Sequence, residues 1–182
     1  MLLTEKEARG ICEKLLSYTK ADDASVGVGS ENYSHLRFAA NAFTTSGARE
    51  NVSVGVTVWI DKKRGSASTN EIDDESLKAT VAQAEQLARI SPVDREYMPT
   101  LGAQTYTPVK SYVDATSNIS LTGRARTIND TIAACEKAGV VGAGFHQARG
   151  TAGASATKNG NFFYDRSSLV SLSTTARTAD GT

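Results

Sequence analysis

The sequence predicts an α+β fold of duplicated helix-plus-antiparallel-meander units, with a mostly antiparallel sheet flanked by three long helices. Three observations predict this class. Three segments carry an apolar stripe at helical spacing. Ser and Thr, 38 of the 182 residues, often alternate with Val, Leu and Ala, as in strands that bury one face. The two halves of the chain also repeat one order of elements.

The composition is typical of a folded domain and excludes several classes of protein. Twenty Lys and Arg balance twenty Asp and Glu, which argues against a dedicated nucleic-acid binder. Two cysteines form neither a disulfide framework nor a four-cysteine zinc site. The longest apolar and glycine run, residues 138–145, is far below the roughly 20 residues that span a bilayer. Residues 1–7 hold no apolar stretch of signal-peptide length, so we expect a soluble cytoplasmic protein.

The first predicted element is a helix that begins after Thr4 and ends near Lys20. Thr4 and Glu7 form a capping-box pattern. The apolar stripe behind it has helical spacing and consists of Ala8, Ile11, Cys12, Leu15 and Leu16. Because Cys12 lies in the stripe with no His or second Cys near it in sequence, we interpret it as a buried core thiol.

Four strands are predicted next, over residues 24–29, 36–41, 52–60 and 66–69. The strongest is 52–60, where Val52, Val54, Val56, Val58 and Ile60 share one face. The charged residues 61–65 before the last strand are interpreted as a solvated hairpin tip, with a phosphate-binding patch as the alternative.

A second helix and an irregular connection follow. Asp73 or Asp74 can cap this helix, its stripe holds Leu77, Val81, Ala84 and Ala88, and Pro92 lies just beyond its end. Residues 91–117 show no regular pattern and hold three tyrosines, Tyr97, Tyr106 and Tyr112. These tyrosines are expected to pin the connection to the domain surface, and a binding strip is the alternative.

The second half begins with a helix over residues 120–138, which Ser117, Asn118 or Ser120 can cap. Its stripe consists of Leu121, Ala125, Ile128, Ile132 and Cys135. Strands are then predicted over 140–147, 150–156, 162–164 and 169–177. The predicted domains are therefore a first α+β unit (1–92), a linker (93–117) and a second α+β unit (118–182).

An internal repeat explains this division. The 20 positions from Asn41 to Asp61 correspond to the 21 from Asn159 to Asp180, in the same order of elements. In the first half the corresponding turn leads into a returning strand, whereas the second half stops at residues 180–182. A turn without its strand leaves a sheet edge unpaired, so we expect this chain to be truncated, a piece of a longer protein.

No motif for chemistry is present. His35 and His146 each sit in a strand-like segment and belong to no HExxH-type sequence. Walker and Gly-x-Ser-x-Gly motifs are absent, and the acidic group Glu71, Asp73, Asp74 and Glu75 is interpreted as a helix N-terminus. Glycines 139, 142 and 144 are interpreted as small residues in a crowded strand. We therefore assign no catalytic, cofactor-binding or metal residue, and expect a non-catalytic module whose sheet can recruit a peptide by strand addition.

Residues 36–88 nevertheless resemble the TldD/PmbA family, a group of metallopeptidases named for its link to modulation of DNA gyrase. The resemblance is carried by the runs Leu36–Asn41, Val54–Val58 and Gly65–Asn70, and by Leu77 and Val81 in the following helix. A further run, 174–182, resembles the family's sequence just before its second half. The resemblance implies that this chain is the N-terminal domain of a two-domain protein.

The resemblance implies that any zinc-binding and catalytic residues lie outside residues 1–182. In TldD-type members a HExxxH helix and a cysteine of the later part bind zinc, and the glutamate activates the metal-bound water. PmbA-type members lack that motif and act as partners. The N-terminal domains are expected to shape a homo- or heterodimer and a cleft for peptide or unfolded substrate. Arg37 and Asn41 match a recurrent family pattern and are interpreted as strand-pairing and turn residues rather than substrate ligands.

Two alternatives to the peptidase-system role remain open. One is a non-enzymatic, PmbA-like partner or regulatory subunit, which the absence of a HExxxH helix in the full protein would favour. The other is a gyrase- or DNA-interacting modulator. Its direct binding to nucleic acid is not expected at zero net charge.

Overall fold

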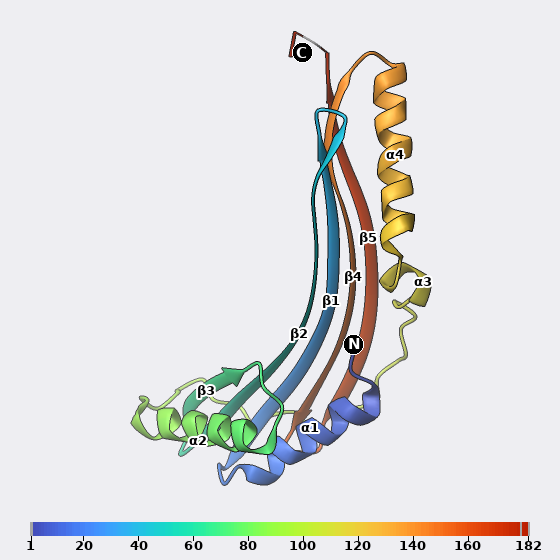
Figure 1. Ribbon diagram of the computed structural model, residues 1–182. Coiled ribbons are helices and arrows are strands. Elements are labelled where there is room, and N and C mark those ends of the chain that lie inside the picture. The colour runs from blue at the N-terminus through green and yellow to red at the C-terminus, as the bar shows by residue number, and fades with distance from the viewer. Residues whose placement is uncertain (1, 179, 182) are drawn as a thin grey trace. The chain divides into compact units, whose positions relative to one another are not determined.

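The computed structural model describes residues 2–178 and 180–181, and its elements are shown in Figure 1. The helices are α1 (Glu5–Tyr18), α2 (Asp74–Ile90), α3 (Asp114–Ser117) and α4 (Leu121–Lys137). The strands are β1 (Asp23–Ala39), β2 (Ala42–Ile60), β3 (Lys63–Thr69), β4 (Val141–Thr157) and β5 (Phe162–Arg177). Ala179 and Thr182, which belong to the predicted terminal run and turn, lie outside the described residues.

The strands form one five-stranded sheet in the order β3-β2-β1-β4-β5. β2 and β3 pair antiparallel from Val54↔Thr69 to Ile60↔Lys63. The start of β1 meets the end of β4, because Lys158 N donates to Ala24 O at 2.9 Å. The end of β1 meets the start of β4, because Asn41 N donates to Gly142 O at 3.2 Å. This antiparallel sheet with helices confirms the predicted α+β class.

The strands are longer and fewer than predicted. Strands expected over 24–29 and 36–41 are one strand, β1, which ends at Ala39. In the same way β4 joins the strands expected over 140–147 and 150–156, and β5 joins 162–164 and 169–177. The predicted breaks fall on polar residues and glycines, which interrupt an apolar pattern without interrupting backbone hydrogen bonds. The turn expected over 61–65 is confined to Asp61 and Lys62, since β3 already begins at Lys63.

The chain divides into two compact units, each assembled from three separate stretches. Unit 1 comprises the described residues within Met1–Ser30, Asn51–Val109 and Ala152–Arg166. Unit 2 comprises those within Glu31–Glu50, Lys110–Thr151 and Ser167–Thr182. The long strands contribute to both units, so this division differs from the contiguous ranges 1–92 and 118–182.

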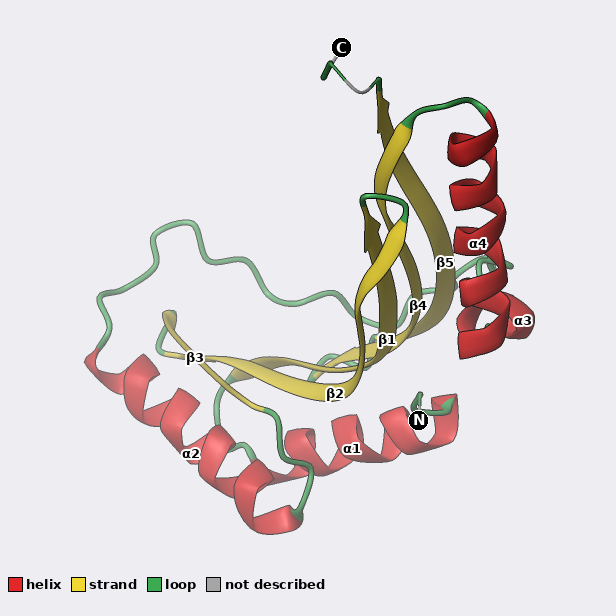
Figure 2. Ribbon diagram, turned by 45° about the horizontal axis from the view of Figure 1, so that its top comes forward, coloured by secondary structure: helices red, strands yellow, loops and turns green. Residues whose placement is uncertain are grey.

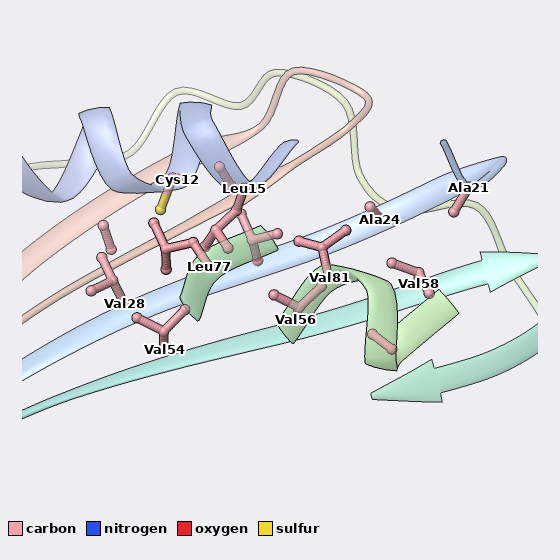
Figure 3. Close-up of a cluster of buried hydrophobic side chains, with 14 of the residues drawn as sticks. Cys12, Leu15, Ala21, Ala24, Val28, Val54, Val56, Val58, Leu77 and Val81 are labelled. Carbon is pink, nitrogen blue, oxygen red and sulfur yellow. The ribbon is translucent and has the colours of Figure 1, made fainter. Parts of the chain in front are cut away.

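The core of unit 1 lies between two helices and one face of the sheet. Figure 2 shows α1 and α2 on the same side of the strands, and Figure 3 shows their side chains meeting those of β1 and β2. The fully or almost fully buried members include Cys12, Leu15, Val28, Val54, Val56, Val58, Leu77 and Val81. Burial raises the pKa of Cys12 to about 11, which keeps the thiol protonated and confirms its interpretation as a core residue.

All three long helices begin where their caps were expected. Thr4 Oγ1 accepts from Glu7 N, and the Glu7 carboxylate accepts from Thr4 N, which completes the capping box of α1. Asp73 accepts from Glu75 N and Ser76 N at the start of α2. Ser120 accepts from Gly123 N at the start of α4.

The core of unit 2 is smaller. α4 lies along β1 and buries Ile128 and Ile132 against Leu36 and Phe38.

No helix among the described residues has both the length and the apolar composition needed to cross a membrane.

The irregular connection is held in unit 1 by side chains, as predicted. Tyr97 OH donates to Asp23 Oδ2 at 3.2 Å, and Thr100 donates to the same carboxylate through its N–H and its hydroxyl. Tyr106 OH and the Asn161 amide hydrogen-bond at 2.9–3.0 Å. The pinning role of Tyr97 and Tyr106 is confirmed. The short helix α3, inside the predicted linker, was not expected.

Candidate functional site

The two histidines lie on β1 and β4 of unit 2 and take part in different contacts. The His35 ring lies 5.8 Å from Tyr33 and 5.5 Å from Phe145. His146 is 1% exposed, and burial, followed by the positive charge of Arg124, lowers its pKa below the ordinary value.

A zinc site does not fit the described residues. They contain no group of three His, Cys, Asp or Glu side chains placed to hold one ion. No step of metal chemistry is therefore assigned to this chain.

The acidic group before α2 has a structural role, as predicted. Asp73 is the helix cap, Glu71 accepts a hydrogen bond from Ser76 Oγ at 2.7 Å, and Asp74 pairs with Lys14 at 2.7 Å. Lys63, which was expected in the charged turn and begins β3, makes an ordinary structural contact, since its Nζ donates to Arg89 O at 3.3 Å.

Gly142 and Gly144 of β4 are in crowded positions, as predicted, but the prediction is wrong for Gly139, which precedes the strand with φ of 66° and where a Cβ would meet nothing within 4 Å. A Cβ on Gly142 would lie 2.7 Å from Cys135 Sγ. A Cβ on Gly144 would lie 2.3 Å from Ser173 O and 2.5 Å from the Phe38 ring. Only glycine therefore fits these two positions without a shift of Cys135, Ser173 or Phe38.

Asn41 joins the β1–β2 turn to β4. Its backbone is left-handed, with φ of 55°. Its amide Nδ2 donates to Val140 O at 3.0 Å, and its Oδ1 accepts from Gly142 N at 2.7 Å. The Asn41 side chain thus supplies a donor and an acceptor to the start of β4, as the backbone of a neighbouring strand would. This confirms the strand-pairing and turn interpretation for this residue. The Arg37 guanidinium instead lies 5.9 Å over the Phe145 ring.

A polar cluster on unit 2 was missed by sequence reasoning. Glu31 pairs with Arg49 at 2.9 Å and with Arg149 at 2.5 Å, and the Arg49 guanidinium lies 4.5 Å over the Tyr33 ring. These residues border a cavity of about 330 Å³. Its members come from β1, β2 and β4, so only the pairing of strands brings them together, and no local motif announces them.

A second cavity, of about 500 Å³, lies farther along the same strands. It is lined by Arg37, Phe145, Thr44, Thr45 and Ser173, among others. Thr44 and Thr45 are exposed, so the cavity adjoins the outer strand of unit 2.

The outer strand of unit 2 offers an open edge. β3 pairs with β2 over Val54–Ile60 only, and β1 lies on the other side of β2. Residues 42–49 therefore have no strand neighbour on their outer side among the described residues. Apart from half-buried Gly47, they are exposed. Free N–H and C=O groups along such an edge are a template for another extended chain.

The fold defines a class: an α+β module built on one five-stranded sheet, in whose described residues no group of three His, Cys, Asp or Glu side chains is placed to hold a metal ion. Residues 24–88 match the family model described as PmbA/TldA metallopeptidase domain 1. Over these residues the chain is similar to the first domain of the TldD/PmbA family, as the resemblance in its sequence indicated.

Solved structures agree in fold. TldE from Thermococcus kodakarensis superposes with a TM-score of 0.77 at 12% identity, over 93% of this chain and 42% of that one. A candidate modulator of DNA gyrase from Thermotoga maritima gives 0.76 at 12% identity, over 94% and 44%. A candidate modulator of DNA gyrase from Bacteroides thetaiotaomicron gives 0.76 at 14% identity, over 95% and 41%.

The chain spans less than half the length of each of these structures. No protein with a curated function matches the sequence.

Proposed function

We propose that this chain is the non-catalytic, peptide-binding domain of a TldD/PmbA-type zinc metallopeptidase system. The observation that carries the proposal is the open edge of β2 over residues 42–49, in a chain whose residues 24–88 match a metallopeptidase family model. An extended or unfolded substrate would pair with this edge through its backbone, as an added antiparallel or parallel strand. Backbone pairing accepts many sequences, which suits a system that processes unfolded segments.

The cavity beside this edge supports the same role. Side chains of an added strand alternate between the two faces of the sheet. Those on one face would reach Thr44, Thr45 and the rest of the 500 Å³ cavity. Hydroxyl groups and the Phe145 ring there can receive polar and apolar side chains alike.

Proline substitutions on the edge test the proposal. Successive residues of an edge strand point their N–H groups alternately inward to the neighbouring strand and outward. Of Thr44→Pro and Thr45→Pro, one therefore removes an outward donor and the other breaks a bond to β1. The variant that keeps wild-type stability should lose affinity for a fluorescent unstructured peptide by about tenfold, in anisotropy titrations.

Hydrogen exchange locates the bound peptide. We expect the amides of residues 42–49 to gain protection when the peptide is added, and a peptide N-methylated at consecutive residues, which lacks donors on both edges, to give none. Protection confined to other strands, or equal peptide affinity in the stable proline variant and the wild type, would refute the edge as the binding site.

The remaining parts of the proposal concern the whole protein. Hydrolysis and its zinc are proposed to reside outside these residues, in a cytoplasmic homo- or heterodimer of family members. A non-enzymatic, PmbA-like partner subunit is the alternative, and the same edge would serve it. A HExxxH helix elsewhere in the full protein would favour the enzyme. Chelator-sensitive peptidase activity of the 182-residue chain alone would contradict both.

A further inference from the structure

Arg124, on the first turn of α4, is a buried cation with unused hydrogen-bond donors. It is 7% exposed, and its Nε and Nη1 atoms have no hydrogen-bond partner. Native structures satisfy most buried donors, so an unsatisfied guanidinium requires a reason. Burial lowers the pKa of Arg124 below its ordinary value.

The Arg124 side chain lines a cavity of about 360 Å³ in unit 2, which we call the Arg124 cavity. Its polar wall comes from the end of α3 and the middle of β1. Asn32 Nδ2 donates to Ser117 Oγ at 3.3 Å and to Asn118 Oδ1 at 3.5 Å. These bonds are at the long limit for hydrogen bonds, so the amide and hydroxyl groups can turn toward a better acceptor.

The charge of the cavity favours a single negative group. Arg49 also lines the cavity, but it already forms an ion pair with Glu31 at 2.9 Å, and its guanidinium lies over the Tyr33 ring. Glu50 lines the same cavity, so a singly charged ligand is opposed less there than a doubly charged one such as phosphate. A carboxylate is a monoanion that accepts two parallel N–H bonds from one guanidinium, through Nη2 together with either Nε or Nη1.

We propose that the Arg124 cavity binds a carboxylate group, held by the Arg124 guanidinium with help from Asn32, Ser117 and Asn118. A peptide C-terminus and a small free carboxylic acid share this chemistry. The inference does not depend on strand addition at residues 42–49, because it concerns a different part of unit 2 and a different interaction.

Acetate is the first probe. In thermal melts at constant ionic strength, sodium acetate should raise the Tm of the 182-residue chain above its value in sodium chloride. A lone carboxylate contact should saturate in roughly the millimolar range. Acetamide, which has the same shape without the charge, should have no such effect. In wild-type NMR spectra the Arg124 Nε–H resonance should shift with the same saturation curve.

Arg124→Met is the critical variant, and Arg126→Met, which removes an exposed arginine of the same helix, is its matched control. Removing an unpaired buried charge is often neutral or stabilising, so Arg124→Met should melt at or above the wild-type temperature. It should nevertheless lose the acetate effect, whereas Arg126→Met should keep it. Arg124→Gln serves the same purpose if the Met variant does not fold.

Peptides distinguish the two sources of the carboxylate, a peptide C-terminus and a small free carboxylic acid. A short peptide with a free C-terminus should compete with acetate for the Arg124 Nε–H shift, and its C-terminal amide should not. If acid and amide behave alike while acetate still binds, the ligand is a small carboxylic acid. An acetate effect unchanged in Arg124→Met, tighter binding of inorganic phosphate than of acetate, or no acetate-specific effect would overturn the proposal.

Discussion

At Gly65 the backbones of β3 and α2 in unit 1 approach each other closely. A Cβ built there would lie 2.1 Å from Ala84 O and 2.3 Å from Ala88 N. Both are backbone atoms of the helix, so no side-chain rotation relieves the clash. Gly65→Ala should therefore lower the free energy of unfolding by about 1–3 kcal/mol in urea titrations.

Gly55 is the matched control, because it lies on the neighbouring strand β2 and an added methyl group would have nothing within 4 Å of it. Gly55→Ala should be neutral or slightly stabilising. Equal losses in the two variants would show that strand glycine itself, rather than the close approach to α2, matters at Gly65.

His146 should make the stability of the chain depend on pH. Burial and the Arg124 charge lower its pKa, so between the two pKa values the unfolded chain binds a proton that the folded chain does not. The contribution of neutral His146 to the free energy of unfolding is fully present above about pH 6.5, the ordinary histidine value. It is lost as the pH falls through the lower pKa of the folded state. His146→Gln should show a shallower loss of unfolding free energy between about pH 7 and pH 5.

The second histidine supplies the comparison for this experiment. His35→Gln leaves His146 and Arg124 in place, so it should keep the pH dependence that His146 causes. An identical pH profile for His146→Gln and the wild type would show that His146 is not its source.

Single residues also explain why the Arg124 cavity escaped prediction. Arg124 lies four residues before Ile128 and eight before Ile132, on the same buried stripe of α4. A charged residue at an apolar stripe position can be recognised in the sequence as unusual. The residues that surround Arg124, Asn32 on β1 and Ser117 on α3, are distant in sequence, so their proximity could not be predicted.

At the scale of elements, the sequence predicts helices better than strands. Helix starts follow from local chemistry: Thr4, Asp73 and Ser120 each accept bonds from the first backbone N–H groups. Strand lengths depend on backbone partners elsewhere. Glu31 and Asn32 are polar and suggest a turn, yet β1 continues through them because β2 and β4 flank it.

The turn between β1 and β2 contains a strained alanine, and glycine at that position should relieve the strain. Two residues connect the strands, and Ala40 and Asn41 have φ of 52° and 55°. Two-residue hairpins of this kind favour glycine, and an alanine in the left-handed region is penalised. Ala40→Gly should raise the free energy of unfolding by roughly 1 kcal/mol, measured by denaturant titration.

Its neighbour in β1 provides the control. Ala39 is the last residue of the strand and does not have positive φ, so Ala39→Gly should destabilise by roughly 0.5–1 kcal/mol. Gains or losses of the same sign in both variants would contradict strain at Ala40.

At the scale of the whole molecule, the hydrophobic cores of the two units differ in size. The unit 1 cluster contains sixteen buried hydrophobic residues among those described, and the unit 2 cluster contains four. Apolar burial is the main stabilising contribution to folding, at about 25 cal/mol per Å². Local opening should therefore cost less free energy in unit 2 than in unit 1.

Strand β1 allows a test within one element, because its residues 23–30 belong to unit 1 and 31–39 to unit 2. Native-state hydrogen exchange should be slower for hydrogen-bonded amides in the first stretch. Ile128→Ala, which removes a fully buried side chain of unit 2, should cost about 2–5 kcal/mol and speed exchange mainly in 31–39. Leu77→Ala, in the unit 1 core, should speed exchange in 23–30. Uniform acceleration of all β1 amides by both variants would mean that the sheet opens as one cooperative unit despite its two cores.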